Sequence, residues 1–366
     1  MRVVHITTVH RADDVRIAVK ECGSLAADGY DVTLVAPSDG AGPVEGMKLL
    51  SIPRYKGRLR RMTLGVATAG RAAWRVRADL YHLHDPELIP LGAIMRIAGK
   101  QVVFDAHEDL ALQVFTKQWI PSAIRPAISF GARCLQWVSE RSMNRVIAAT
   151  PAIAQSYRRA VVVSNFPVLS EFPAHDVAAY ASRPQAVAYV GGLTEPRGVR
   201  QMIEAMDLVG PDLDARLELA GVFSPSSLER SCQGLAGWSR VRYHGWASRS
   251  QVGSILGHVR VGLVVLQPAS NYIDSYPTKL FEYMAAGIPV IASDFPLWRE
   301  IVNEGGFGLA VDPTNPRAIA DAITYLLEHA SEAEAMGDRG RQAVSERFNW
   351  EAQGEVLLRT YREVLG

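Results

Sequence analysis

Short hydrophobic runs rich in β-branched residues alternate with longer amphipathic stretches along the whole chain. Runs of this kind are typical of buried strands, and the stretches between them have helical periodicity. Regular alternation of the two predicts parallel β-sheets covered by helices. The first half predicts strands at 3–7, 32–36, 80–83, 101–105 and 146–149. Helices are predicted near 14–28, 62–77, 87–98 and 125–142.

The alternation stops at 170–184, a stretch rich in Pro, Ser and Ala, and then starts again. We interpret this stretch as a linker. The second half predicts strands at 186–190, 217–220, 241–244, 261–266, 288–292 and 308–311. Helices are predicted between these strands, and three more close the chain at 316–328, 331–348 and 350–364. The expected architecture is α/β, with two doubly wound domains at 1–168 and 185–348 and a ligand site in the cleft between them.

Composition places the chain among ordinary globular proteins. Its 366 residues suit two domains, and 48% hydrophobic with 21% charged residues is unremarkable for an enzyme. A net charge of +1 says nothing about nucleic acid. The three cysteines are scattered and match no metal or redox spacing, which favours a reducing compartment. We expect a cytoplasmic protein, because no run approaches a membrane span and the first residues do not resemble a signal peptide.

Charge is unevenly distributed, because 46–78 contains no acidic residue. The basic residues of this segment are Lys48, Arg54, Lys56, Arg58, Arg60, Arg61, Arg71, Arg75 and Arg77. Met62, Leu64, Val66 and Trp74 stand among them. One interpretation is a solvated basic surface. The other is peripheral contact of 54–77 with an anionic membrane at its inner face, or with a phosphate-bearing acceptor.

Several common nucleotide-binding classes lack their motifs. The turn after the first strand reads Thr-Thr-Val-His-Arg-Ala-Asp-Asp and contains no glycine, so it is not a dinucleotide-binding turn. The second strand ends Val-Ala-Pro without the acidic residue that would hold an adenosine ribose. A Walker-type phosphate loop and a Gly-x-Ser-x-Gly elbow are both missing. Dehydrogenase, P-loop and serine-hydrolase functions are therefore disfavoured.

The first turn of the second domain has the features of an anion site. It reads Tyr-Val-Gly-Gly-Leu-Thr-Glu-Pro-Arg-Gly over 189–198, just before a predicted helix. Gly191 and Gly192 would let a ligand approach the backbone closely, and the helix start offers free N–H groups. Arg197 stands at that start. The alternative is that glycines open many such turns and that Arg197 is simply exposed.

Two carboxylates flank the start of another predicted helix. Asp274 and Glu282 have seven residues between them, and Pro277 suits the first turn of a helix over 278–286. Lys279 precedes Glu282 by three positions and shares its face. This set would suit a polyol that carries a phosphate. The alternative is an ordinary solvated surface, with Lys279 in a salt bridge to Glu282.

Together these segments resemble the family-four glycosyltransferases, which have the GT-B fold of two doubly wound Rossmann-like domains facing a central cleft. Asp274, Glu282 and the following Tyr-Met-Ala-Ala-Gly-Ile-Pro-Val-Ile-Ala resemble the family's two-carboxylate motif. The turn Val-Gly-Gly-Leu with Arg-Gly resembles its glycine-rich turn. Asn165 stands where the family's linker begins, and Arg-Phe-Asn-Trp at 347–350 resembles its closing segment. The resemblance covers nearly the whole chain and implies that 350–366 crosses back onto the first domain.

The resemblance implies a metal-independent enzyme without a cofactor. It would transfer a sugar, with retention, from a nucleoside-diphosphate sugar to a hydroxyl acceptor such as a saccharide or a lipid-linked glycan intermediate. A UDP sugar is expected first, with a GDP sugar as the alternative. The implied catalytic residues are His107, Asp274 and Arg197. His107 would face the donor sugar, Asp274 would hold its hydroxyls, and Arg197 would meet the diphosphate.

Donor binding is further assigned to Gly191, Gly192, Glu282 at the ribose, and His244 near the base. Two positions depart from the family's pattern. Asp274 replaces a Glu, which shortens its reach by one methylene group. Gly192 replaces the usual second diphosphate arginine, and we predict that Lys279 supplies the missing cation.

Acceptor-side candidates follow three strands of the first domain. They are His10, Asp13, Asp14, Arg16, His84 and Glu108. For Asp13 or Asp14 the alternative is a cap on the first helix, and Asp85 is predicted to cap the helix after the third strand.

Two other functions remain open from the sequence. A nucleotide-sugar epimerase of the same fold would release an epimerised sugar from the donor alone. A non-catalytic sugar-nucleotide-binding subunit would bind the donor and release no nucleoside diphosphate.

Overall fold

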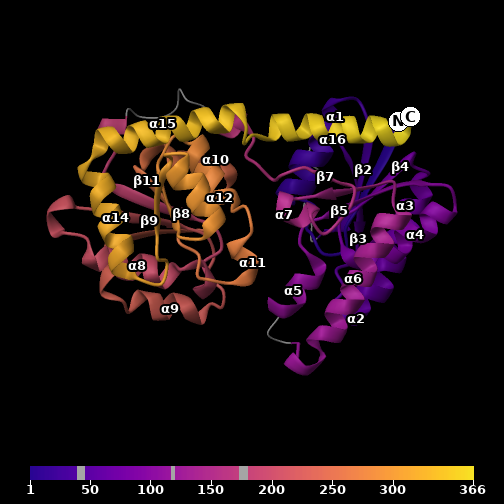
Figure 1. The fold of residues 1–366 in the computed structure, drawn as a ribbon, viewed down its shortest axis with the longest axis horizontal. Helices are drawn as coiled ribbons and strands as arrows, with labels where there is room; N and C mark the ends of the chain where they lie inside the picture. The colour runs from indigo at the N-terminus through magenta and orange to yellow at the C-terminus, as the bar shows by residue number, and fades with distance from the viewer. Residues whose placement is uncertain (39–45, 117–119, 173–179) are drawn as a thin grey trace. The chain divides into compact units, whose positions relative to one another are not determined.

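The computed structural model describes residues 1–38, 46–116, 120–172 and 180–366. The chain divides into two compact units, one of residues 1–165 and 350–366 and one of residues 166–349 (Figure 1). Most of the predicted linker, 173–179, lies outside the described residues. The prediction of two doubly wound parallel sheets is confirmed, with seven strands in unit 1 and six in unit 2.

Unit 1 has the strand order β3-β2-β1-β4-β5-β6-β7, with every pair parallel. Its strands are β1 (Arg2–Ile6), β2 (Asp31–Pro37), β3 (Lys48–Ile52), β4 (Leu80–Leu83), β5 (Gln101–Ala106), β6 (Arg145–Ala148) and β7 (Ala160–Val162). The helices include η1 (Val15–Cys22), α1 (Gly23–Ala27), α2 (Arg58–Arg60), η2 (Arg61–Gly65), α3 (Val66–Val76), η3 (Pro86–Leu88), α4 (Ile89–Ile97), α5 (Leu110–Thr116), η4 (Ser122–Ile124), α6 (Arg125–Ser142) and α7 (Pro151–Ala154).

The last helix of the chain, α16 (Trp350–Leu365), belongs to unit 1 (Figure 1). Its buried face includes Leu357 and Tyr361, and it packs against η1 and α1. Trp350 Nε1 donates to Ser24 Oγ at 2.8 Å, and Arg362 pairs with Asp28 at 3.1 Å. A segment more than 300 residues away in sequence therefore completes the core of the first unit.

Unit 2 has the strand order β10-β9-β8-β11-β12-β13, again all parallel. Its strands are β8 (Ala186–Val190), β9 (Arg216–Ala220), β10 (Val241–Gly245), β11 (Val261–Val264), β12 (Val290–Ser293) and β13 (Gly308–Val311). The helices include η8 (Glu195–Arg197), α8 (Val199–Leu208), η9 (Pro211–Leu213), α9 (Ser227–Gln233), η10 (Ala236–Arg240), α10 (Arg249–His258), α11 (Ser270–Ile273), α12 (Thr278–Ala285), α13 (Pro296–Arg299), η11 (Glu300–Glu304), α14 (Pro316–Glu328) and α15 (Ala330–Glu346). Short turns η5 (Leu169–Glu171) and η7 (Tyr180–Ser182) precede them.

Both sheets reverse their strand order at one point, between β1 and β4 in unit 1 and between β8 and β11 in unit 2. At such a point the connections leave in opposite directions and open a crevice beyond the carboxyl ends of the strands. The residues that follow β1, β4, β5, β8 and the strands next to them are therefore the first place to look for a site.

Two local predictions need correction. Strand β3 was not predicted. It is a short edge strand, and the polar residues Lys48 and Ser51 interrupt its hydrophobic sequence. The strand predicted at 288–292 begins only at Val290. Gly287, in a left-handed conformation, follows the end of α12, and Pro289 has no N–H to donate to a neighbouring strand.

Candidate functional site

In unit 1 the carboxyl ends of β1, β4 and β5 lie side by side and carry most of the polar candidates. The loop 7–10 follows β1, His84 and Asp85 follow β4, and His107 follows β5. Because the strands are parallel neighbours, these residues meet at one edge of the sheet. The structure thus brings together three separate parts of the sequence.

Asp85 holds the loop that follows β1. Its carboxylate accepts hydrogen bonds from Thr7 Oγ1 at 2.8 Å and from the Thr8 backbone N–H at 2.6 Å. It makes no capping bond to η3, so the prediction that it caps this helix is wrong. The carboxylate is engaged by the two threonines instead, so a tertiary contact replaces the local one.

His10 and Asp14 form a half-buried pair within that loop. His10 Nδ1 lies 3.2 Å from Asp14 Oδ2, and His10 Nε2 lies 3.7 Å from Asp85 Oδ1. Burial alone would lower the pKa of His10, but its bond to Asp14 and the nearby carboxylates raise it above its ordinary value. Burial would raise the pKa of Asp14, yet the His10 and Ile17 bonds lower it to about 2. Asp14 also accepts from the Ile17 N–H, which confirms its predicted role as a cap.

Arg16 is buried and binds Asp105 with two hydrogen bonds of 2.9 and 2.8 Å. Its third contact is a 2.8 Å bond to the carbonyl oxygen of Val163. Burial would raise the pKa of Asp105, but the Arg16 charge holds it well below its usual range. A bidentate arginine fixes a carboxylate rigidly. In this structure Arg16 positions Asp105.

Asp105 in turn positions His107. His107 Nε2 lies 3.1 Å from Asp105 Oδ2 and 3.4 Å from His84 Nδ1. The His107 ring stacks on His10 with centroids 5.0 Å apart. Its side chain is 21% exposed, whereas Asp105 is fully buried. An oriented imidazole with a carboxylate behind it and one open side is suited to binding a hydroxyl group or moving a proton.

The two remaining acceptor-side candidates do not join this group. Asp13 is exposed and pairs with Arg11 at 2.8 Å, and Glu108 is exposed. The structure instead adds residues that sequence reasoning missed, namely His5, Glu21 and His82. His5 and His82 lie in hydrophobic strand sequences, and Glu21 follows Lys20 in a helical stretch. The one signal in the sequence is the Leu-Tyr-His-Leu-His run at 80–84, in which histidines alternate with a hydrophobic residue.

In unit 2 the turn after β8 is built from glycines. Gly191 has a φ of 150°, and Gly198 has a φ of 74°, which is a left-handed conformation. A Cβ on Gly198 would lie 2.1 Å from the Val265 carbonyl oxygen. A Cβ on Gly221, after β9, would lie 1.7 Å from the Gly191 carbonyl oxygen. Side chains are excluded here because the backbones that follow β8, β9 and β11 pack directly on one another.

Two cations converge on this turn, from segments more than 80 residues apart. A Cβ built on Gly191 would lie 3.3 Å from both Arg197 Nη1 and Lys279 Cε. Arg197 is half-buried and makes side-chain hydrogen bonds with Tyr189 and Tyr272. Burial lowers the pKa of Arg197, but these tyrosines more than reverse that effect. The result is a backbone turn with two cationic side chains beside it, which suits a phosphate or diphosphate.

The two carboxylates lie at either end of the same segment. Glu282 is on α12, and its Oε2 accepts a 2.9 Å hydrogen bond from Lys279 Nζ. Asp274 ends α11 and is exposed. Trp298 Nε1 donates to the Ser275 carbonyl oxygen at 2.7 Å and so ties the intervening loop to α13. His244 lies on the edge strand β10, where its Nε2 pairs with Glu218 of β9.

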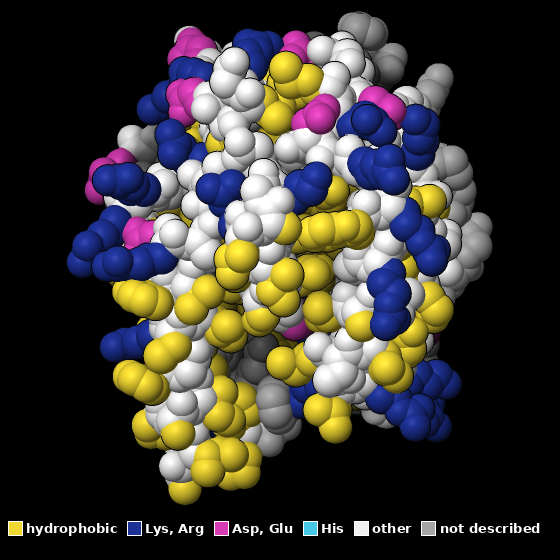
Figure 2. Space-filling view, turned by 90° about the vertical axis from the view of Figure 1, so that its right-hand side faces the viewer, with side chains coloured by type: hydrophobic (Ala, Val, Ile, Leu, Met, Phe, Trp, Pro, Cys, Tyr) yellow, Lys and Arg dark blue, Asp and Glu magenta, His cyan; other side chains and the backbone are white. Residues whose placement is uncertain are grey.

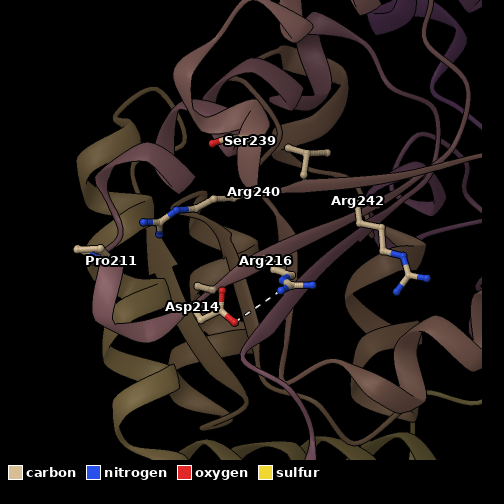
Figure 3. Close-up of a pocket in the computed structure, with 8 residues that line it drawn as sticks. Pro211, Asp214, Arg216, Ser239, Arg240 and Arg242 are labelled. Atoms are coloured by element: carbon tan, nitrogen blue, oxygen red, sulfur yellow. Dashed lines mark ion pairs between the residues drawn. The ribbon is translucent and has the colours of Figure 1, made fainter.

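A surface pocket of about 330 Å³ lies elsewhere in unit 2 (Figure 3). Asp214, Arg216, Arg240 and Arg242 are among its lining residues, and Asp214 pairs with Arg216 at 3.6 Å. These residues stand at the amino ends of β9 and β10. Ligand sites of open parallel sheets form at the carboxyl ends, so this pocket is not the candidate site.

Comparison with known proteins agrees with the fold. The family model for glycosyl transferases group 1 matches residues 156–343, and the glycosyl transferase 4-like domain matches residues 16–169. The chain belongs to the glycosyl transferases group 1 family. As a member of this family it is a glycosyltransferase, and it acts in the biosynthesis of glycans or glycoconjugates.

Curated relatives of this group 1 chain include enzymes that act on inositol compounds. A phosphatidyl-myo-inositol mannosyltransferase of Mycobacterium leprae is 27% identical over 373 residues, covering 93% of this chain and 90% of that protein. A D-inositol 3-phosphate glycosyltransferase of Corynebacterium urealyticum is 31% identical over 189 residues, covering 49% of this chain and 43% of that protein.

Solved structures show the same GT-B fold. Sucrose-phosphate synthase from Thermosynechococcus elongatus superposes with a TM-score of 0.79 at 21% identity, covering 100% of this chain and 99% of that one. Anabaena Alr3699/HepE in complex with UDP-glucose gives 0.74 at 15% identity, covering 99% and 100%. The resemblance to the family-four glycosyltransferases and to their fold is confirmed. Among the described residues, no helix is both long and apolar enough to cross a bilayer.

Proposed function

We propose that this group 1 glycosyltransferase transfers a sugar, with retention of configuration, from a nucleoside-diphosphate sugar to a hydroxyl acceptor. Unit 2 binds the donor and unit 1 binds the acceptor. His107, Asp274 and Arg197 are the catalytic residues we propose. The reaction needs no metal ion, because protein cations meet the diphosphate.

One observation carries the donor proposal, the convergence of Arg197 and Lys279 on the Gly191–Gly192 turn. Breaking the bond to the sugar leaves negative charge on the diphosphate, and fixed cations beside backbone N–H groups stabilise that charge. Gly192 lacks the side chain of a second arginine, and we propose that Lys279, whose Cε lies 3.3 Å from a Cβ built on Gly191, supplies that charge. Glu282, held at 2.9 Å by Lys279, is proposed to accept hydrogen bonds from the ribose hydroxyls.

The UDP-glucose complex of Alr3699/HepE supports a nucleotide-sugar donor, and UDP is the nucleotide we propose first. GDP is the alternative. His244 is engaged with Glu218, so we assign recognition of the base to backbone groups after β9 and β10 rather than to this side chain. Asp274 is exposed at the end of α11 and is proposed to bind hydroxyls of the donor sugar.

The acceptor is proposed to be lipid-linked and reached at an anionic membrane surface. Figure 2 shows hydrophobic side chains gathered over the lower part of the face that it presents, with Lys and Arg beside and above them. The exposed large hydrophobic residues of α2, η2, α3, α5, η4 and α6 are Leu59, Met62, Leu64, Trp74, Leu112, Phe115, Ile124, Ile128, Phe130 and Trp137. Such surfaces mark interaction sites. The lipid named in the mycobacterial relative's description supports the same class of acceptor.

The test is a panel of UDP and GDP sugars with mass-spectrometric detection of the released diphosphate, followed by phosphoinositide and polyprenyl-phosphate acceptors with the best donor. Transfer with retained anomeric configuration, read by NMR, is the expected result. An epimerised free sugar from donor alone would favour the epimerase. Donor binding without diphosphate release under any condition would favour a binding subunit.

The His107→Ala variant separates the two units' roles. We expect turnover to fall by roughly 100-fold or more, as is usual for loss of a general acid or base, while donor affinity stays within about two-fold. If donor affinity collapses instead, His107 does not act on the acceptor side.

A further inference from the structure

Beneath the acceptor-side residues of unit 1 lies a cluster of four buried polar side chains. His5 is on β1, Glu21 on η1, and His82 and His84 come from β4 and its carboxyl end. All four are at most 2% exposed. His84 is also an acceptor-side candidate, whereas His5, Glu21 and His82 have no part in the proposed sites. Burying such groups is costly unless something satisfies them.

The distances in the cluster do not fit direct hydrogen bonds to Glu21. Its Oε2 lies 3.8 Å from His5 Nδ1, 3.8 Å from His84 Nε2 and 3.9 Å from His82 Nδ1. Among the described residues neither Glu21 oxygen has a hydrogen-bond partner, although Arg16 Nε is 3.1 Å from Oε1. Two ligands of one tetrahedral zinc ion lie about 3.3 Å apart, within about half an ångström of these distances.

The outward nitrogens of two histidines already have oriented oxygen partners. His84 Nδ1 lies 3.4 Å from Asp105 Oδ2, and Tyr361 Oη lies 3.1 Å from His5 Nε2. His5 Nδ1 and His84 Nε2 share a 2.9 Å hydrogen bond, which a bound ion would replace. His82 Nδ1 is hydrogen-bonded to Tyr361 Oη at 2.7 Å, and His82 Nε2 has no hydrogen-bond partner among the described residues. Metal-binding histidines commonly donate their second N–H to a carboxylate or another oxygen, which fixes the tautomer and leaves the inner lone pair for the ion.

We propose that His5, Glu21, His82 and His84 bind one divalent transition-metal ion of the Zn²⁺ class. Three imidazole nitrogens and one carboxylate oxygen form a borderline-soft set that suits four-coordinate Zn²⁺. Their ligand atoms all lie within 4.8 Å of one another. The ion would satisfy the Glu21 carboxylate, whose nearest cation, Arg16, is already bound to Asp105.

The ion is structural, because four protein ligands leave no open position. It would join β1, η1 and β4 and, through Tyr361, helix α16. It would also hold His84 with Nδ1 toward Asp105, next to His107. This role is separate from donor binding in unit 2, so the inference stands or falls apart from the proposed donor site.

The test begins with metal analysis of the full chain, purified without a histidine tag and passed through gel filtration in chelator. Inductively coupled plasma mass spectrometry should find about one zinc per chain, as for a closed structural site. His5→Ala and Glu21→Gln should each remove most of it. The matched controls are His258→Ala and His329→Ala, which change exposed histidines of unit 2 and should keep the metal. Equal metal in all variants would overturn the site.

A second measurement uses only the wild-type chain, so it does not depend on whether the variants fold. The wild-type chain grown with Co²⁺ in place of zinc should show the visible absorption of a tetrahedral Co²⁺ complex. Anomalous diffraction at the zinc edge should place one peak between His5, Glu21, His82 and His84. A well-folded wild-type chain without bound metal would overturn the proposal and leave a water molecule or a protonated Glu21 at this place.

Discussion

At the scale of single residues, the donor side depends on charge placed next to bare backbone. The side chains of Arg197 and Lys279 both lie close to Gly191. The glycine turn could be recognised in sequence, because its motif is local. The convergence of Lys279 could only be guessed, because Lys279 lies 88 positions beyond Gly191 in the sequence.

Replacing Arg197 with Ala should weaken binding of UDP or GDP. Loss of charge-assisted hydrogen bonds costs about 1.5–3 kcal/mol, which is roughly 10- to 150-fold in affinity. Isothermal titration calorimetry measures it. Arg200→Ala is the matched control, because Arg200 lies one position past the start of α8 and pairs with Glu195. Equal affinity of wild type and Arg197→Ala would contradict the assignment of the diphosphate to this turn.

The His10–Asp14 pair predicts a pH-dependent contribution to stability. The raised pKa of His10 gives stability that is complete below its ordinary value of 6.5 and is lost as pH rises through the folded value. The pKa of Asp14, lowered from 3.8 to about 2, gives stability that is present above 3.8 and is lost as pH falls towards 2. The pair therefore stabilises the folded protein most between pH 3.8 and pH 6.5.

The measurement is thermal unfolding of wild type and His10→Gln across this range. The wild type should be more stable by about 1 kcal/mol or less near pH 5, since the pair is partly exposed. The difference should shrink at pH 8 and above. A constant difference at every pH would show that the pair contributes no charge interaction.

At the scale of elements, buried parallel strands were the easiest to predict. The bounds of β4 and β8 agree with the prediction, because strands covered on both faces have continuous hydrophobic sequences. Edge strand β3 lacks this signal and was missed. Asp14 was recognised as a cap from its place before a helix. The role of Asp85 was predicted wrongly, because its hydrogen-bond partners Thr7 and Thr8 follow another strand.

Gly198, between η8 and α8, tests how tightly these elements pack. Gly198→Ala should destabilise the protein by about 2–4 kcal/mol, because a Cβ would meet the Val265 carbonyl and the left-handed backbone disfavours alanine. Gly210→Ala is the control, since a Cβ there meets nothing within 4 Å. Chemical denaturation followed by tryptophan fluorescence measures both. Similar midpoints for the two variants would mean that the turn relaxes without cost.

At the scale of the whole molecule, composition and alternation indicated two doubly wound sheets, and each unit has one. The chain's last helix rejoins the first unit, and the family resemblance had implied this. The unit boundary in the structure lies at 165–166. The basic segment, by contrast, could be interpreted only from the structure, which shows that Leu59, Met62, Leu64 and Trp74 are exposed.

Membrane contact predicts binding to anionic vesicles that weakens with salt. Leu59, Met62 and Leu64 are 77%, 52% and 53% exposed beside arginines of α2. Each basic residue near an anionic surface contributes about 1 kcal/mol, and the effect fades as the screening length shortens. Vesicle sedimentation at low and high salt measures it.

Changing Leu59 and Leu64 together to Glu should abolish that binding. Trp246→Ser provides the control, because Trp246 is a 74% exposed hydrophobic residue of unit 2 outside the basic segment. If the wild type does not bind the vesicles, or binds them equally at low and high salt, the basic segment is a solvated surface and the membrane proposal is wrong.

The sequence alone determined the alternation of strands and helices, the glycine turn, the Asp274–Glu282 segment and the family, because each depends on neighbours in the chain. Only the tertiary structure decided which polar groups meet. His5, Glu21, His82 and His84 come from separate segments and converge because β1 and β4 are adjacent and η1 packs over them. Arg16 and Asp105 are 89 positions apart and share two hydrogen bonds. Long-range pairing of this kind follows from the order of strands in a sheet, which local patterns do not encode.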